Sequence, residues 1–588
     1  MRQFFITVFG TIIGIFAFFI LLILLFISLG LSQAGSSAAK VKGKQVLTMD
    51  LRQPLKDHGA PSNLFGAASP SVVNITRLLS QAKDDKSIAG LFIRANGSGM
   101  VPASAEEIRL AILDFKTSGK FVITHAQGFE SPSLMPYYAI SASDEIWLQD
   151  TTGFATAGLY SETEFYGGVL EKFEAQPQID QFYEYKNAAN TYTQKDFTPA
   201  HRKAATSYMT SIFDTAVTNI SQDRALSPAE LQNILGAAPH SAENAAKLNM
   251  IDKLGQVEEA REYIRERTDG KDTSFLSLVN YELKEKYTGD AIAFIGGQGA
   301  VVTGASTDGS NPFTGGGITM GGDTLAKAID DATKDKSVKA IVFRVSSPGG
   351  SPAASDQIHA AVARAKEADK PVIISMGQYA ASGGYYVSTN ADKIVAMPTT
   401  ITGSIGVLGG KVALEKSFAK IGYNVEGITI GGDYAGAYSA DTPFNQSQKA
   451  AYHRQLEDIY EDFTMRVAQG RGLSLETVKD IAKGRVWTGA QAKEIGLVDA
   501  LGGFRRAVEI AKEEAGLDAD AELRIKRFPR PKTTAEQLEK LLGSSVALSE
   551  NAQTLSAILS LPEVQAALTV RQKALIGQEL SAVLPNIE

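Results

Sequence analysis

The chain contains two divergent copies of one unit, and this duplication constrains its fold more than any other feature of the sequence. The stretch KSIAGLFIR at Lys86–Arg94 returns as KSVKAIVFR at Lys336–Arg344. Each copy then continues through a glycine-containing loop, a segment of helical periodicity and a second apolar run. The 588 residues also exceed what one hydrophobic core usually supports. We therefore expect two related domains in tandem.

Within each copy, short apolar runs alternate with stretches of helical periodicity. This alternation is typical of parallel βαβ units, in which a helix returns the chain to the same edge of a sheet. The sequence therefore predicts an α/β fold built twice. The expected strands are Gln45–Met49, Gly90–Arg94, Ala291–Ile295, Ala340–Arg344 and Pro371–Ser375, and the expected long helices are Ala200–Val217 and Asn445–Ala468.

The N-terminal region is almost wholly apolar. No charged residue lies between Arg2 and Lys40, and the apolar stretch Phe4–Leu31 exceeds the about 20 residues that a helix needs to cross a bilayer. A cleaved signal peptide is the alternative, because Ser32–Ala34 resembles a small-residue cleavage site. The length of the stretch favours an uncleaved transmembrane helix. The expected organisation is an anchor at residues 1–32, a linker at 33–44, the first copy at 45–285, the second copy at 286–527 and a helical tail at 528–588.

Composition excludes several classes of function. A formal net charge of −7, without a basic stripe, argues against a nucleic-acid partner, because phosphate binding needs concentrated lysine and arginine. The chain has no cysteine, which excludes disulfides, thiol nucleophiles and cysteine-ligated metals. Its 6 histidines stand singly, without the spacing that places two on one face of an element. We therefore expect neither a metal site nor a cofactor.

Two residues with catalytic potential are kept in opposite copies. When the copies are aligned, Ser382 of the second falls opposite Leu134 of the first, and Lys186 of the first falls opposite Gly432 of the second. A serine hydroxyl needs a base to become a good nucleophile. A lysine amine can be that base once burial lowers its pKa from about 10.4 towards about 7–8. The pattern therefore predicts one Ser/Lys dyad assembled from two incomplete sites.

Each member of this dyad also has a purely structural interpretation. Ser382 lies in the small-residue turn Ala380–Gly384, which either exposes the hydroxyl at the start of a helix or only allows close helix packing. Lys186 has aromatic neighbours that would bury it, yet most lysines are solvated surface residues. The two signals support each other only through the repeat.

Two further turns are candidates for completing the site. Gly349 and Gly350 follow an apolar strand and precede a helix, where backbone N–H groups can hold an oxyanion; a tight turn without function is the alternative. Gly383, next to the serine, offers another N–H. Ser404 in the turn TGSIGV either orients the lysine amine by a hydrogen bond or forms an ordinary turn, and the alignment places Thr156 opposite it.

The motifs SPGG, ASGGYYV and TGSIGV of the second copy and YEYKNAA of the first together resemble the long, tandem form of the signal peptide peptidase A (protease IV) family. The resemblance covers most of the chain, although residues 528–588 are less readily matched. It implies a Clp-protease/crotonase-type fold. It also implies a serine protease with a Ser/Lys dyad that degrades cleaved signal peptides and other apolar peptides.

Residue by residue, the resemblance implies that Ser382 is the nucleophile, Lys186 the general base and Ser404 the residue that holds the lysine. It implies an oxyanion hole made by an N–H group of the Gly349–Gly350 turn and one at Ser382 or Gly383. It further implies a homotetramer whose active sites open into an enclosed apolar chamber. The expected location is the bacterial inner (cytoplasmic) membrane, with a single span and the catalytic part on the periplasmic side.

Two other functions remain open on the sequence alone. A crotonase-type acyl-CoA enzyme would use the same oxyanion geometry on a thioester, although no phosphate-binding lysine cluster accompanies the turn. A non-catalytic membrane scaffold of stomatin-partner type would use the repeats only for assembly.

Overall fold

The computed structural model describes residue 14 and residues 43–59, 71–268, 270–281, 289–308, 317–519, 521 and 523–530. Apart from Gly14, the expected membrane anchor lies outside these described residues, as does residue 531 onward of the expected tail. Within the described part, no helix combines the length and apolar character that a membrane span requires.

The duplication is visible in the two parallel sheets. The first sheet has the strand order β8-β4-β3-β2-β1-β9, and all of its pairs are parallel. The second sheet repeats this order as β19-β15-β14-β13-β10-β20, and it adds β16 and an antiparallel β18 beside β14. The strands of the first sheet are, in chain order, β1 Gln45–Asp50, β2 Ile88–Ala95, β3 Phe121–Ala126, β4 Glu145–Leu148, β8 Lys253–Leu254 and β9 Ser274–Ser277. Those of the second are β10 Ala291–Gln298, β13 Val338–Ser347, β14 Val372–Ala381, β15 Lys393–Ala396, β16 Ile401–Gly403, β18 Val486–Thr488, β19 Ala500–Leu501 and β20 Arg524–Phe528.

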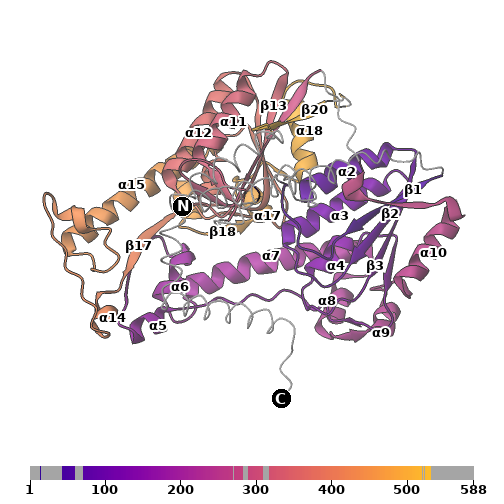
Figure 1. Cartoon of the computed structure of the whole chain (residues 1–588), viewed down its shortest axis with the longest axis horizontal. Helices are drawn as coiled ribbons and strands as arrows, with labels where there is room; N and C mark the ends of the chain where they lie inside the picture. Colours follow the sequence, from indigo (N-terminus) through magenta and orange to yellow (C-terminus); the bar gives the residue numbers. More distant parts are fainter. Residues whose placement is uncertain are drawn as a thin grey trace, which may run out of the picture.

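Helices cover both faces of each sheet (Figure 1). In the N-terminal half they are α2 Val72–Asp84, α3 Pro102–Lys116, α4 Met135–Ile140, α7 Pro199–Asp223, α8 Pro228–Gly236 and α9 Ala242–Lys247 on one face and α10 Val257–Arg267 on the other. In the C-terminal half, α11 Gly322–Lys334, α12 Pro352–Glu367, α13 Gly383–Tyr386, α15 Gln446–Arg471, α16 Leu475–Ile481 and α17 Gly489–Glu494 take one face, and α18 Phe504–Glu514 takes the other. The duplicated α/β architecture expected from the sequence is therefore confirmed.

The two halves meet around a buried ion cluster. Arg344, on β13 of the C-terminal half, donates to Asp57 at 2.6 Å and to Glu107 of α3 at 2.7 Å. All three side chains are at most 2 % exposed. Burial opposes the charge on Asp57, but Arg344 and His58 hold the pKa of its carboxyl below the ordinary value. Because a buried charge is costly unless it is paired, separating the halves at this point would leave unpaired buried charges.

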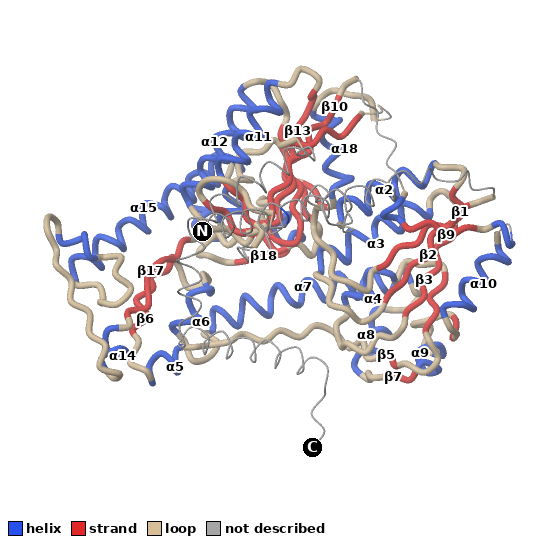
Figure 2. The backbone as a smooth tube through the Cα atoms, in the orientation of Figure 1, coloured by secondary structure: helices blue, strands red, loops and turns tan. Residues whose placement is uncertain are grey.

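The two halves also meet at a second junction. Strand β6 (Gln176–Phe182) of the N-terminal half pairs antiparallel with β17 (Val407–Ala413) of the C-terminal half over their full length. Figure 2 shows the two strands side by side at the left, with α5 (Gly167–Lys172) and α14 (Glu415–Ala419) at their end. The long helix α7 runs from the N-terminal core towards this arm (Figure 1). The segment of the N-terminal half that follows β6 is thereby brought next to the C-terminal half.

Candidate active site

Ser382 lies in a strained turn between β14 and α13. Its φ of 54° and ψ of −122° fall outside the regions that side chains normally adopt, at a cost of about 1–3 kcal/mol. The turn is held by its own backbone: the Ser382 N–H donates to Gly403 O at 2.9 Å, and its carbonyl accepts from Tyr385 and Tyr386. Such a strand–turn–helix element projects a nucleophile away from the sheet.

Lys186 reaches this serine from the other half of the molecule. It follows β6 and directly precedes the short 3-10 helix η1 (Asn187–Ala189). Its Nζ lies 3.1 Å from Ser382 Oγ, 2.8 Å from the carbonyl oxygen of Ser404 and 2.9 Å from Ser404 Oγ. These three predicted residues therefore meet within one chain.

The lysine amine is positioned where the neutral form is favoured. Lys186 is 6 % exposed, and burial lowers its pKa to about 7. A neutral amine has two N–H donors and one lone pair. If the donors face the two oxygens of Ser404, the lone pair faces Ser382 Oγ, which is the arrangement that a general base needs.

The glycine turns present two backbone N–H groups beside the serine. The N–H of Gly349 is already bonded to Ser347 Oγ at 3.1 Å, and that of Ser382 is bonded to Gly403. The N–H groups of Gly350 and Gly383 have no acceptor among the described residues. They lie close together, because a Cβ built on Gly383 would be 3.2 Å from the nitrogen of Gly350. Of the predicted oxyanion donors, Gly350 and Gly383 are thus the two that remain available.

A cavity of about 870 Å³ opens over the dyad. Its walls come from both halves: Tyr208 and Ile212 lie on α7, whereas Tyr386 and Phe463 belong to α13 and α15. Aromatic and aliphatic side chains of this kind suit an apolar ligand.

The equivalent position of the N-terminal half has the matching backbone hydrogen bond but no hydroxyl group. The Leu134 N–H donates to Gly158 O at 2.9 Å, as the Ser382 N–H does to Gly403 O. Leu134 is fully buried, with an ordinary φ of −71°. Gly432, at the place of Lys186 in the other copy, is exposed. Each half therefore contains one member of the predicted dyad and no counterpart of the other.

The same hydrogen bonds correct one detail of the sequence alignment. Because Gly158 occupies the place of Gly403, the residue at the place of Ser404 is Leu159 and not Thr156. The Thr156 hydroxyl is buried and has no partner among the described residues. The alignment shifted because the turns of the two copies differ in length.

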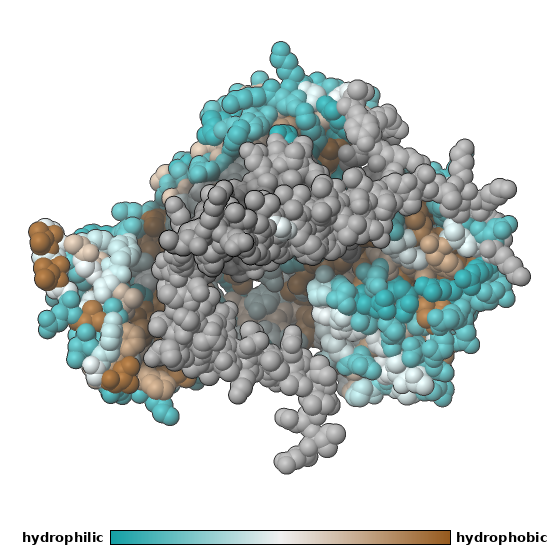
Figure 3. Space-filling model, viewed as in Figure 1, coloured by the Kyte–Doolittle hydropathy of each residue, from teal (hydrophilic) through white to brown (hydrophobic). Residues whose placement is uncertain are grey.

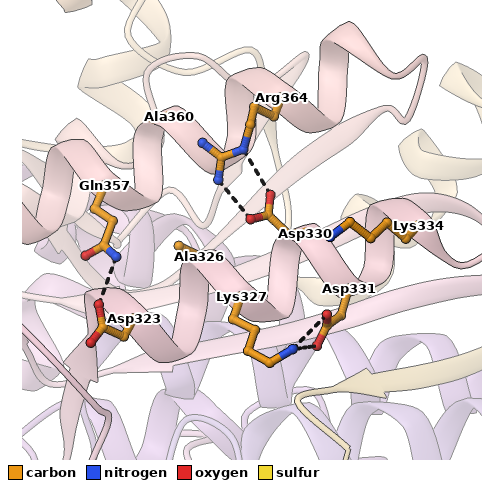
Figure 4. Close-up of a pocket in the computed structure, with 9 residues that line it drawn as sticks. All are labelled: Asp323, Ala326, Lys327, Asp330, Asp331, Lys334, Gln357, Ala360 and Arg364. Atoms are coloured by element: carbon orange, nitrogen blue, oxygen red, sulfur yellow. Dashed lines mark hydrogen bonds and ion pairs between the residues drawn. The ribbon is translucent and has the colours of Figure 1, made fainter.

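A second hollow, of about 380 Å³, lies between α11 and α12 and has a different character. Figure 4 shows that its charged side chains pair with one another: Arg364 with Asp330, and Lys327 with Asp331. These partially exposed pairs satisfy their own charges and include no nucleophile next to a base. We assign no function to this surface.

Sequence reasoning missed the turn Lys483–Arg485, which contacts both Lys186 and Ser404. The carbonyl of Lys483 accepts from the N–H groups of Tyr183 and Tyr185, and the carbonyl of Arg485 accepts from the N–H of Ser404. No residue-type signal points to this role, because it depends on backbone carbonyls and on the absence of a side chain at Gly484.

Comparison with known proteins identifies the family of this site. The model of peptidase family S49 matches the chain twice, at residues 115–270 and 364–518, once in each half. The chain belongs to peptidase family S49. The S49 chain is 31 % identical to "Protease 4" of Salmonella typhi, over 96 % of its own length and 92 % of the relative.

Two other relatives cover most of the S49 chain. It is 28 % identical to "Serine protease SPPA, chloroplastic" of Arabidopsis thaliana, over 92 % of its length and 79 % of the relative. It is 29 % identical to "Protease 4" of Haemophilus influenzae, over 85 % of its length and 83 % of the relative. The resemblance inferred from the short motifs is thereby confirmed.

Proposed function

We propose that the chain is a serine endopeptidase in which Ser382 is the nucleophile and Lys186 the general base. The observation that carries this proposal is the 3.1 Å separation of Lys186 Nζ and Ser382 Oγ, two residues from opposite copies. Family membership and the names of the relatives support the reaction class.

The first half of the reaction forms an acyl-enzyme. Neutral Lys186 takes the proton of Ser382 Oγ as this oxygen attacks the peptide carbonyl carbon. The N–H groups of Gly350 and Gly383 hold the resulting oxyanion. The Lys186 ammonium then gives its proton to the departing amine nitrogen, the C–N bond breaks, and the new N-terminus leaves.

The second half of the reaction is hydrolysis. Lys186 takes a proton from water, whose oxygen attacks the ester carbon, and the proton returns to Ser382 Oγ as the C–O bond breaks. Ser404 accepts the two amine hydrogens of Lys186 and thereby keeps its lone pair directed at the nucleophile or the water.

The substrates we propose are apolar peptides, including cleaved signal peptides, bound as an added strand along the cavity. The aromatic and aliphatic walls of the cavity support an apolar preference. Strain at Ser382 and two free N–H donors support a Clp/crotonase-type arrangement of the site in this half. The expected setting is the bacterial inner membrane, anchored by residues 4–31 with the catalytic part on the periplasmic side.

We also propose a homo-oligomer, with four copies as the family resemblance implies. Strands β6 and β17 join the two halves within a chain. Aligning Lys186 with Gly432 puts residues 422–428 opposite β6, and these residues have no strand partner among the described ones. Ile428, within this stretch, and Ile430 are 93 % and 90 % exposed. Figure 3 shows scattered brown, hydrophobic residues on the lobe that carries β6, β17 and α14 in Figure 1. A second copy would cover them by repeating the junction between halves.

The dyad is tested with purified full-length protein and an apolar fluorogenic peptide. Ser382→Ala and Lys186→Met should each lower kcat by at least about 10⁴-fold, because members of a catalytic unit fail together. Lys195→Met is the control, since that side chain is 64 % exposed. Normal cleavage by either dyad variant would defeat the proposal.

Two measurements separate the rival functions. A serine-reactive acylating probe should label Ser382 in the wild type and not in Ser382→Ala, whereas a crotonase without a nucleophile escapes labelling. A scaffold would assemble normally and leave the peptide intact after long incubation.

The oligomer needs a separate test. Ile430→Lys should reduce the mass of the assembly measured by light scattering, while Val279→Lys, at a 47 % exposed position of the N-terminal half, should not.

A further inference from the structure

The main chain of Lys186 lies against a turn of the C-terminal half. The turn Lys483–Arg485 connects α16 to β18. The Lys483 carbonyl accepts the N–H groups of Tyr183, at 3.3 Å, and Tyr185, at 3.1 Å. The Tyr185 N–H belongs to the residue directly before the lysine. The segment that carries the base is therefore attached to the C-terminal half through the backbone of Tyr183 and Tyr185, and the base itself through its amine.

The same turn is attached to the loop that holds the amine. The Gly484 N–H donates to Ile405 O at 2.8 Å, and the Ser404 N–H donates to Arg485 O at 2.8 Å. One short segment thus contacts both the root of the lysine side chain and the residue that orients its tip.

Gly484 is where these segments come closest. A Cβ built on it would lie 2.5 Å from Lys186 Cβ and 2.6 Å from both the Cα and the N of Lys186. These atoms belong to the main chain of Lys186 or are bonded to it, so a rotation of the side chain cannot move them away. Gly484 also has a φ of 78°, a conformation that favours glycine.

We propose that Gly484 is a positioning residue of the dyad: lacking a side chain, it lets the turn Lys483–Arg485 lie directly on the main chain of Lys186 and so sets where the amine meets Ser382. The inference rests on the proposed function. An ordinary contact begins near 3.4 Å, so a methyl group at 2.5 Å would separate the two segments by roughly 1 Å. Displacement of a catalytic group by that amount can lower the rate about 100-fold.

The test compares two glycines with similar backbones and different surroundings. Gly484→Ala should lower kcat about 100-fold with little change in KM. Gly472→Ala is the matched control, because Gly472 also has a left-handed backbone, with φ of 63°, but no atom lies within 4 Å of the place that its Cβ would take. It carries the same backbone penalty without touching the base, and it should keep kcat close to wild type.

The pH profile separates positioning from a loss of folded protein. A displaced amine is better hydrated, which favours the ammonium, so the acid limb of kcat should move to higher pH in Gly484→Ala. Partial unfolding would lower kcat at every pH and leave the limb in place. The inference would be overturned if Gly484→Ala and Gly472→Ala had the same kcat and the same acid limb in their pH profiles.

A second variant covers the case in which Gly484→Ala does not fold. Gly406 has no left-handed backbone, and its Cβ would lie 2.5 Å from Phe182 O and 2.7 Å from Gly484 Cα. Gly406→Ala therefore moves the turn Lys483–Arg485 and the end of β6 away from the loop at Ser404, which should also lower kcat, and wild-type kinetics in this variant would overturn the inference. Ser382→Ala is measured in parallel. If it stays active, the proposed function fails; if it is inactive while the glycine variants behave normally, only the role of Gly484 fails.

Discussion

Ser382 and Leu134 occupy the same place in the two halves, yet only one of them is strained. Both N–H groups donate to a glycine carbonyl across the turn at 2.9 Å. Ser382 nevertheless has a φ of 54°, whereas Leu134 has an ordinary φ of −71°. The halves share connectivity and strand order, and they differ in backbone geometry where a nucleophile is present.

This difference indicates that the strain belongs to the proposed chemistry and not to the fold. A fold that required the unusual backbone would have kept it in both copies. The N-terminal half has an ordinary backbone conformation at this position, which is occupied by a buried leucine. The C-terminal half, in turn, has an exposed glycine where the base would be. Strained conformations persist only where surrounding structure holds them.

The largest expected effect comes from moving the nucleophile between halves. Leu134→Ser introduced into Ser382→Ala should leave kcat at least about 10⁴-fold below wild type, because Lys186 lies at the other turn and no lysine stands at Gly432. Rates are compared on the same apolar peptide. Recovery of activity in the double variant would show that the halves are interchangeable, contrary to our comparison.

The next effect is the dependence of activity on pH. Burial lowers the pKa of Lys186 to about 7, and only the neutral amine can accept the serine proton. Activity should therefore rise with pH up to this value and fall about tenfold per unit below it, or about 100-fold between pH 7 and 5. A profile of kcat/KM from pH 5 to 9 measures the limb. A limb near the pKa of an exposed lysine would contradict the buried base.

A smaller effect is expected from the hydroxyl that orients the amine. Ser404→Ala removes one hydrogen bond to Lys186 and leaves the Ser404 carbonyl in place, so kcat should fall about tenfold. Thr156→Val is the comparison in the N-terminal half, where the hydroxyl has no partner among the described residues. It should not lower kcat. Equal effects of the two substitutions would remove Ser404 from the site.

The smallest effect concerns the stability of the contact between halves. Glu106 on α3 accepts hydrogen bonds from the N–H and hydroxyl of Thr399, and burial raises its pKa to about 7. The unfolded chain loses this proton near pH 4.5, so the folded state should lose stability as the pH rises from there to about 7. Glu106→Gln should flatten the fall in Tm between pH 5 and 8. Asp356→Asn, at the matching position of α12, is the control; an unchanged slope in Glu106→Gln would contradict the expectation.

Much of the fold could be predicted from periodicity. The expected strands at residues 45–49 and 340–344 lie within β1 and β13. The expected helix at 445–468 begins one residue before α15. Strand β14 extends to Ala381, beyond the expected end at Ser375, because pairing with β16 continues it past the apolar run. The local pattern of apolar residues does not reveal which strands pair in the folded protein.

The site was predictable as a set of residue types and not as a geometry. Complementary loss between the copies indicated Ser382 and Lys186, and the structure brings them within hydrogen-bond distance. Which glycine N–H groups stay free depends on neighbours such as Ser347, whose hydroxyl occupies the N–H of Gly349. The contact of Gly484 with Lys186 depends on two backbones that are distant in sequence. Neither feature leaves a mark on residue type alone.

The ion cluster of Arg344, Asp57 and Glu107 makes the two copies depend on each other. Its arginine is encoded in one copy and both carboxylates in the other, just as the alcohol and the amine are divided. Severing the chain between the repeats would leave each fragment with half of a charge network and half of the proposed dyad. The two copies therefore depend on each other for the buried charges and for the proposed dyad alike, and neither could stand in for the other.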